Sequence, residues 1–298
     1  MTPTIAMTRR TERYVHGTRP EEQRRLTQLN GLLNDACLRE LALKDGETVL
    51  DVGSGLGQFT RAMRRTVGPK GRVVGIERDP RQIAEARRQA KVEGEDDLVE
   101  WRQGEALSLP LGKNERFDVA HARFVLEHVP QPRKVVEQMV RAVRPGGRVV
   151  LSDDDHDVLR LYPPLPAFDA VWRAYLRVYD RLGCDPLVGR HLVALLHQAG
   201  AKPVRNTWIF FGSCVGDPNF ADYVSNMIGV VDAARDDITG PLGMDRNDFD
   251  NALRETRAWG RRPDAAIWFA LCWAEGVTPL KSRPFAPRTT DNSQRRKL

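Results

Sequence analysis

The sequence predicts an α/β protein whose core is a doubly wound, mostly parallel sheet of seven strands. Short apolar, strand-like segments alternate with amphipathic, helix-like segments across the first two thirds of the chain. Near the C-terminus, a long stretch with helical character interrupts this alternation before one last apolar segment. Such alternation is typical of a parallel sheet that is covered by helices on both faces.

The chain divides into an N-terminal arm with a cap helix, a core, a helical lid insertion, a last core strand and a disordered basic tail. In this order the segments are 1–45, 46–211, 212–263, 264–280 and 281–298. The lid is predicted because its segment is too long for a loop between neighbouring strands. The tail is predicted because it is rich in Pro, Ser and Thr and ends in basic residues.

The cap helix is predicted over residues 19–43, where Leu26, Leu29 and Leu33 have helical spacing and Pro20 suits a first turn. Buried strands are predicted at 48–52, 72–77, 98–102, 117–121, 148–152, 203–211 and 265–273. Further helices are predicted at 57–67, 80–93, 132–143, 168–182 and 187–198.

Composition limits the class of protein. No apolar run approaches the ~20 residues that span a bilayer. The N-terminus also lacks an apolar stretch of signal-peptide length, so we expect a cytoplasmic protein without a membrane partner. Lys and Arg outnumber Asp and Glu by 46 to 40. No RNA-reading motif accompanies this charge, which argues against a nucleic-acid partner. The sequence leaves both a monomer and a homodimer open.

The segment after the first strand carries the clearest functional signal. Gly53, Gly55 and Gly57 follow an apolar strand directly and precede a helix, where a ligand needs close approach to the backbone. A dinucleotide fingerprint would place its third glycine at position 58, which is Gln58. Asp51 would attract the ammonium of a bound amino-acid group, directly or through water, and would repel a pyrophosphate.

Further motifs follow in order along the chain. Glu77 ends the second strand, where a carboxylate can accept hydrogen bonds from both ribose hydroxyls. The run Asp51–Gly57 resembles the first motif of S-adenosylmethionine-dependent methyltransferases with a Rossmann-like fold. Residues 102–110 resemble that family's adenine loop, with Glu105 in place of Asp. Residues 117–129 and 144–147 resemble its later motifs, so the resemblance covers roughly residues 46–155.

The resemblance implies that S-adenosylmethionine is the cofactor and S-adenosylhomocysteine the product. The segment Tyr14–Gly17 also resembles the arm of a ubiquinone/menaquinone and natural-product subgroup, whose tyrosine covers the methionine end of the cofactor. We expect cofactor contacts at Tyr14, Asp51, Gly53, Gly55, Gly57, Glu77, Arg78, Gln82, Glu105, Ala106 and Arg123.

Two histidines follow the fourth and fifth strands and are the candidate proton acceptors. An imidazole titrates near neutral pH, so either His128 or His156 can take a proton from the acceptor. The acidic run around His156 would orient its ring. We expect no metal, because adjacent carboxylates at one strand end cannot all face one ion.

The aromatic C-terminal half predicts a pocket for an apolar or aromatic small molecule. We expect substrate contacts at Tyr14, His16, Tyr162, Trp172, Tyr175, Tyr179 and Trp208. Basic side chains would meet an acidic group on this molecule; the candidates are Arg173, Arg177, Arg181 and Arg190. The lead hypothesis is a biosynthetic small-molecule methyltransferase. The alternatives are an RNA or protein methyltransferase and a descendant that binds the cofactor without transferring its methyl group.

Overall fold

The computed structural model describes residues 20–280, and the side chains from residue 23 onward. Its main sheet has seven strands, which confirms the predicted fold class. In spatial order the strands are β3 (Glu100–Gln103), β2 (Arg72–Glu77), β1 (Thr48–Val52), β4 (Phe117–Arg123), β5 (Val143–Asp154), β10 (Ala270–Val277) and β7 (Lys202–Phe210). The first five strands in this spatial order pair in parallel with one another. Strand β10 is antiparallel to both of its neighbours, β5 and β7.

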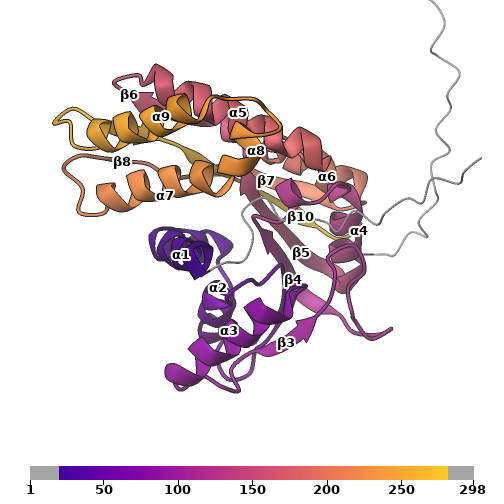
Figure 1. Cartoon of the computed structure of the whole chain (residues 1–298). Coiled ribbons are helices and arrows are strands. Elements are labelled where there is room, and N and C mark those ends of the chain that lie inside the picture. Colours follow the sequence, from indigo (N-terminus) through magenta and orange to yellow (C-terminus); the bar gives the residue numbers. More distant parts are fainter. Residues whose placement is uncertain (1–19, 281–298) are drawn as a thin grey trace, which may run out of the picture.

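Helices cover both faces of this sheet (Figure 1). The helices beside the sheet are α1 (Pro20–Leu41), α2 (Gln58–Thr66), α3 (Pro80–Val92), α4 (Pro132–Ala142) and α6 (Leu192–Gln198). Val49 packs with the cluster that includes α1 and α2, whereas Leu50 packs with the cluster that includes α4 and α6. Successive residues of a strand point to opposite faces, so one short apolar strand serves two cores.

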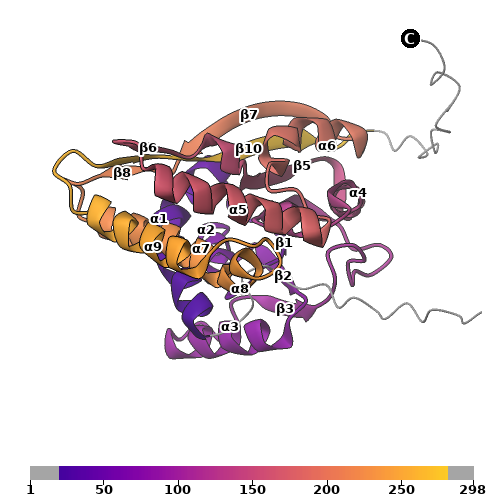
Figure 2. The same ribbon diagram turned by 45° about the horizontal axis from the view of Figure 1, so that its top comes forward.

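The lid is larger than the sequence predicts. Helix α5 (Pro166–Leu182) was expected in the core, but its Phe168, Tyr175 and Tyr179 pack in one hydrophobic cluster with the lid helices. Those helices are α7 (Phe220–Ala233), α8 (Arg235–Thr239) and α9 (Arg246–Trp259). Figures 1 and 2 show the four helices grouped together beside the sheet. The reason is the apolar stripe along α5, which fits other helices as well as it would fit a sheet.

The last predicted strand is divided between two sheets. A second, three-stranded antiparallel sheet contains β6 (Arg160–Tyr162), β9 (Ala266–Trp268) and β8 (Ser213–Cys214). The chain leaves this sheet at Phe269 and enters the main sheet as β10. The predicted strand at 265–273 is therefore wrong as one element, because an apolar run alone does not show where its hydrogen-bond partners change.

Three 3₁₀ turns complete the fold, namely η1 (Leu126–His128), η2 (His156–Val158) and η3 (Val188–His191). Turns η1 and η2 follow strands β4 and β5 at the carboxyl edge of the sheet, which is where ligands bind in folds of this kind. Among the helices of residues 20–280, none has both the length and the apolar character of a membrane span.

Candidate functional site

The bend between β1 and α2 depends on three glycines with left-handed backbone conformations. The φ angles of Gly53, Gly55 and Gly57 are 75°, 53° and 74°. A Cβ at Gly57 would lie 2.2 Å from the ring of Trp101, and one at Gly53 would lie 2.4 Å from Val125. A Cβ at Gly55 would meet only Gln82 Oε1, at 3.4 Å. Of the three glycines, Gly55 therefore has the open side that a ligand would approach.

Glu77 lies at the end of β2, beside this bend, as predicted. Its side chain is buried, and its two carboxylate oxygens accept hydrogen bonds from the backbone N–H groups of Gly55 (3.1 Å) and Asp79 (2.9 Å). Burial raises the pKa of Glu77. Each oxygen keeps a further lone pair, so the carboxylate can accept two ribose hydroxyls while it fixes the loop.

Asp51 is buried beside the bend, and its carboxylate has partners within the protein. Its carboxylate is buried, accepts a hydrogen bond from Thr60 Oγ1 at 2.6 Å, and lies 2.9 Å from His121 Nδ1. Both oxygens are thus engaged by α2 and β4. The physical role that the structure shows for Asp51 is to fasten the first turn of α2 to the sheet.

Arg123, a predicted cofactor contact, has several partners within the protein. Its guanidinium lies 4.2 Å from the centre of the Phe59 ring and donates hydrogen bonds to Asn30 (2.7 Å) and Asn34 (2.9 Å) on α1. Arg123 therefore joins β4 to α1 and α2. Its Nη1 is buried and has no hydrogen-bond partner among the described residues.

The remaining predicted cofactor residues lie along the same edge with different exposures. Arg78 follows Glu77 directly, Glu105 is exposed, and Ala106 packs against the hydrophobic core. Tyr14 lies outside the described residues. Gly55, Gln82 and Glu77 thus form the part of the bend that fits a nucleoside: an open glycine, an amide beside it and a buried carboxylate with spare lone pairs. S-Adenosylmethionine fits this donor and acceptor set.

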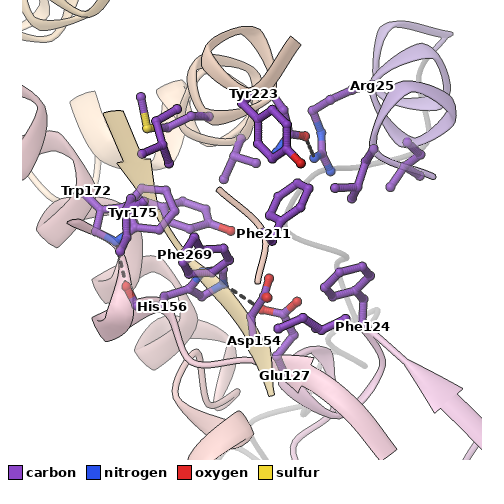
Figure 3. A pocket seen from close by; sticks show the side chains of 18 of the residues that line it. Arg25, Phe124, Glu127, Asp154, His156, Trp172, Tyr175, Phe211, Tyr223 and Phe269 are labelled. Atoms are coloured by element: carbon purple, nitrogen blue, oxygen red, sulfur yellow. Dashed lines mark hydrogen bonds and ion pairs between the residues drawn. The ribbon is translucent and has the colours of Figure 1, made fainter. Parts of the chain in front are cut away.

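A cavity of about 780 Å³, a volume that includes its opening to solvent, lies at the ends of β4 and β5 (Figure 3). Its walls come from α1, α5, α7 and the β9–β10 segment. The aromatic residues of its lining are Phe124, Trp172, Tyr175, Phe211, Tyr223 and Phe269. The polar residues are Arg25, Glu127, His128, Asp154, His156 and Asn226. This combination of aromatic walls and a few convergent polar groups is typical of small-molecule sites.

The predicted substrate residues divide into three groups. Trp172 and Tyr175 line the cavity, and Tyr179 is buried behind Tyr175. Tyr162 and Trp208 are 64% and 65% exposed and do not line this cavity, so the structure does not bring them together with the other predicted residues. Their strands β6 and β7 turn these side chains outward. Tyr14 and His16 lie outside the described residues.

The cation that lines the cavity is not one of the predicted arginines. Arg190 instead forms ion pairs with Asp155 and Asp157 at 2.7 and 3.1 Å, and Arg173, Arg177 and Arg181 do not line the cavity. Arg25 on α1 does, and its Nη1 donates to Asn226 Oδ1 on α7 at 2.7 Å. No local pattern in the sequence indicates this position of Arg25, because it depends on α1 lying next to α7.

His156 and His128, the predicted proton acceptors, both line the cavity and meet at Glu127. Glu127 Oε2 lies 2.9 Å from His156 Nε2 and accepts a hydrogen bond from Tyr179 at 3.0 Å. His128 Nε2 lies 3.4 Å from Glu127 Oε1. The hydroxyl of Tyr175 lies 2.7 Å from that of Tyr179 and extends this network along α5.

Burial shifts the pKa values of this cluster in opposite directions. It raises the pKa of Glu127 to about 7 and lowers that of His128 to about 3. It also lowers the pKa of His156 and raises that of Asp154. In each case the buried surroundings favour the uncharged form. Glu127 is not among the predicted site residues, although a lone carboxylate within the mostly apolar run Phe124–Val129 is a signal for it.

The spacing of the cluster also bears on metal binding. Ligand-type atoms of Glu127, Asp154 and His156 lie within 4.8 Å of one another. That spacing would admit a divalent cation, but Glu127 Oε2 already takes part in hydrogen bonds with both His156 and Tyr179. A cation bound there would share Oε2 with these two groups or bind Oε1, which lies 3.4 Å from His128 Nε2.

Comparisons with known proteins point to one family. A family model described as a methyltransferase domain matches residues 22–206. A 2-phytyl-1,4-naphtoquinone methyltransferase of Synechococcus elongatus is 32% identical over 137 residues, which are 46% of this chain and 57% of the relative. An arsenite methyltransferase of Halobacterium salinarum is 40% identical over 113 residues, 38% of this chain and 28% of the relative.

A solved structure shares the fold. The crystal structure of a putative methyltransferase from Bacillus halodurans C-125 superposes with a TM-score of 0.56 at 19% identity, over 83% of this chain and 99% of that one. Curated relatives are matched over only part of their length, about half or less for the first three. Through the matched domain, which spans more than half of its length, the chain belongs to the methyltransferase domain family.

Proposed function

We propose that the chain transfers a methyl group from S-adenosylmethionine to an apolar or aromatic small molecule, in a biosynthetic pathway. The observation that carries this proposal is the aromatic cavity at the ends of β4 and β5 (Figure 3), close to the bend, where Gly53 packs against Val125 just after β4. Relatives named as quinone and arsenite methyltransferases support a small acceptor. Arg25 suits an acidic group on it.

Methyl transfer from a sulfonium is an in-line displacement, so the protein acts mainly by holding the two reactants in line and excluding water. Glu77 and the backbone at Gly55 hold the nucleoside. The aromatic walls exclude water and orient a flat acceptor. When the acceptor loses a proton, the cluster of Glu127, His128 and His156 receives it.

Titration calorimetry with S-adenosylmethionine and S-adenosylhomocysteine tests this proposal. We expect both to bind with micromolar dissociation constants. Absence of binding below millimolar ligand would overturn the proposed function. Tight binding without turnover on a broad panel of hydroxylated aromatic acceptors would favour the non-transferring alternative.

The variant Glu77→Gln tests the assignment of the nucleoside site. Loss of the charged acceptor of two ribose hydrogen bonds should weaken S-adenosylhomocysteine binding by roughly 10- to 100-fold. The control is Glu85→Gln on α3, where the exposed Arg88 is the ion-pair partner, and it should leave affinity unchanged. If Glu77→Gln binds as tightly as this control, the ribose assignment fails.

A further inference from the structure

Glu127 is the point where the polar groups of the cavity converge. It is 3% exposed, lies in turn η1, and lines the cavity that we assign to the acceptor. His156 Nε2 and the hydroxyl of Tyr179 are both within hydrogen-bond distance of one of its oxygens, Oε2. Its other oxygen, Oε1, lies 3.4 Å from His128 Nε2.

We infer that the Glu127 carboxylate, rather than either histidine, takes the proton of the methyl acceptor, and that His156 is a neutral hydrogen-bond donor that orients it. This inference rests on the proposed function, because it concerns the acceptor of that reaction. The role of proton acceptor, which the sequence pattern assigns to His128 or His156, is thereby assigned to the neighbouring carboxylate of Glu127.

The contacts around Glu127 hold it in one orientation. Trp172 Nε1 donates to the backbone oxygen of His156 at 3.0 Å, which fixes turn η2 and places the imidazole against Glu127. The hydroxyl of Tyr175 lies 2.7 Å from that of Tyr179 and helps to hold the Tyr179 hydroxyl toward Glu127. The titratable and charged groups around Glu127 from the elements packed there are His128, Asp153, Asp154, His156, Tyr175, Tyr179 and Arg25.

The step balances in atoms and charge. The O–H bond of the acceptor breaks and its proton forms an O–H bond with Glu127, while an oxygen lone pair attacks the methyl carbon. The bond from that carbon to sulfur breaks, and its electron pair stays on sulfur. A sulfonium cation and a carboxylate anion are thereby converted into neutral S-adenosylhomocysteine and a neutral carboxylic acid.

This route avoids a buried cation. If His156 or His128 took the proton, an imidazolium would form in a site where burial already lowers the pKa of both rings. Burial raises the pKa of Glu127 to about 7. A base of that pKa can accept a proton during turnover and release it to solvent at neutral pH afterwards.

Nuclear magnetic resonance tests the inference without knowledge of the acceptor. The full chain is labelled with nitrogen-15 in histidine and carbon-13 in the glutamate carboxyl, and saturated with S-adenosylhomocysteine. We expect His156 and His128 to stay neutral from pH 6 to pH 8, with the His156 proton on Nε2. We expect one glutamate carboxyl to titrate near pH 7 in the wild type and to be absent from Glu127→Gln.

Controls separate this inference from the proposed function. Asp157→Asn, at a 64% exposed side chain near the cluster, should keep the titration near pH 7. An imidazolium at either histidine within pH 6–8, or a Glu127 signal that does not titrate there, would overturn the inference. So would a His156 spectrum that changes with a chelator or with added Zn²⁺, because the cluster would then hold a cation. Calorimetry on the same samples reports cofactor binding independently.

Discussion

Gly57 begins helix α2 with a φ of 74°, and a Cβ at this position would lie 2.2 Å from Trp101. The same indole lies 2.9 Å from the Cβ position of Gly75 on β2. These two glycines therefore leave room for the indole of Trp101, which extends from β3 over β2 to the start of α2. The glycine pattern that suggested a ligand is partly a packing requirement, and at Gly55 the open side remains.

Gly57→Ala should cost more stability than Gly94→Ala. Both glycines have similar positive φ angles, 74° and 71°, so both substitutions carry left-handed strain of ~1 kcal/mol. Nothing lies within 4 Å of a Cβ at Gly94, whereas Gly57→Ala adds a collision with Trp101. We expect an additional loss of roughly 1–3 kcal/mol in urea unfolding of the cofactor-free protein. Equal losses would show that Trp101 moves aside freely.

Single residues show where sequence reasoning succeeds at the site. The predicted position of Glu77 at the end of a buried strand depends only on local pattern, and the structure places it at the bend. Glu127 and Arg25 depend on neighbours far away in the chain, from α5 and α7, so no local pattern identifies their surroundings. Asp51 fits the motif in position. Its carboxylate also has hydrogen-bonding partners within the protein, namely Thr60 and His121.

Among the elements, strand β3 at the edge of the sheet is fastened by a network of charges. Arg102 pairs with Glu115 at 2.8 Å and with Glu100 at 2.6 Å, and Arg72 on β2 also reaches both carboxylates. The hydrogen bond with Arg102 is the largest cause that lowers the pKa of Glu115 to about 2. The network thus links the edge strand to the loop that precedes β4.

Glu115→Gln should make the free energy of unfolding depend less on pH in the acidic range. Because the folded pKa of Glu115 lies below its unfolded value, its contribution is complete above about pH 4.5 and is lost as the pH falls towards 2. We expect the variant to lose ~1 kcal/mol at pH 7, after allowance for solvent screening, and to approach the wild type as the pH is lowered. Urea unfolding at pH 7, 5, 4 and 3 measures this. A difference that stays constant from pH 7 to pH 3 would contradict the account.

Element types were predictable from the sequence, but their partners were not. The helix predicted at 168–182 is present as α5, while its position beside α7 and α9 follows from packing in one hydrophobic cluster. The strands β6 and β8, of three and two residues, are too short to show a pattern of their own. These short strands are present because β6 and β8 each pair with one of the two edges of β9.

In the molecule as a whole, α1 connects the core to the lid. On one side Asn30 and Asn34 bind Arg123 of the core. On the other side Arg25 and Gln28 hydrogen-bond to Asn226 and Asp222 on α7. The cap helix predicted from apolar spacing therefore also forms a wall of the aromatic cavity, and its polar residues join the sheet to helix α7.

The net charge of +6 is the one feature that favours an RNA acceptor. We expect this charge to give weak, non-specific binding that disappears as salt rises to 150 mM, since such binding depends on counterion release. Fluorescence anisotropy with a structured RNA, from 50 to 200 mM salt, measures it. A dissociation constant of ~1 μM or tighter at 150 mM salt would favour the RNA methyltransferase alternative.

The most direct test of the account is a crystal structure of the protein with S-adenosylhomocysteine. We predict that the ribose hydroxyls donate to Glu77, that the nucleoside lies over Gly55, and that the sulfur faces the aromatic cavity beside Glu127. If the ligand lies elsewhere, or its sulfur faces away from that cavity, the proposed reaction at this site is contradicted.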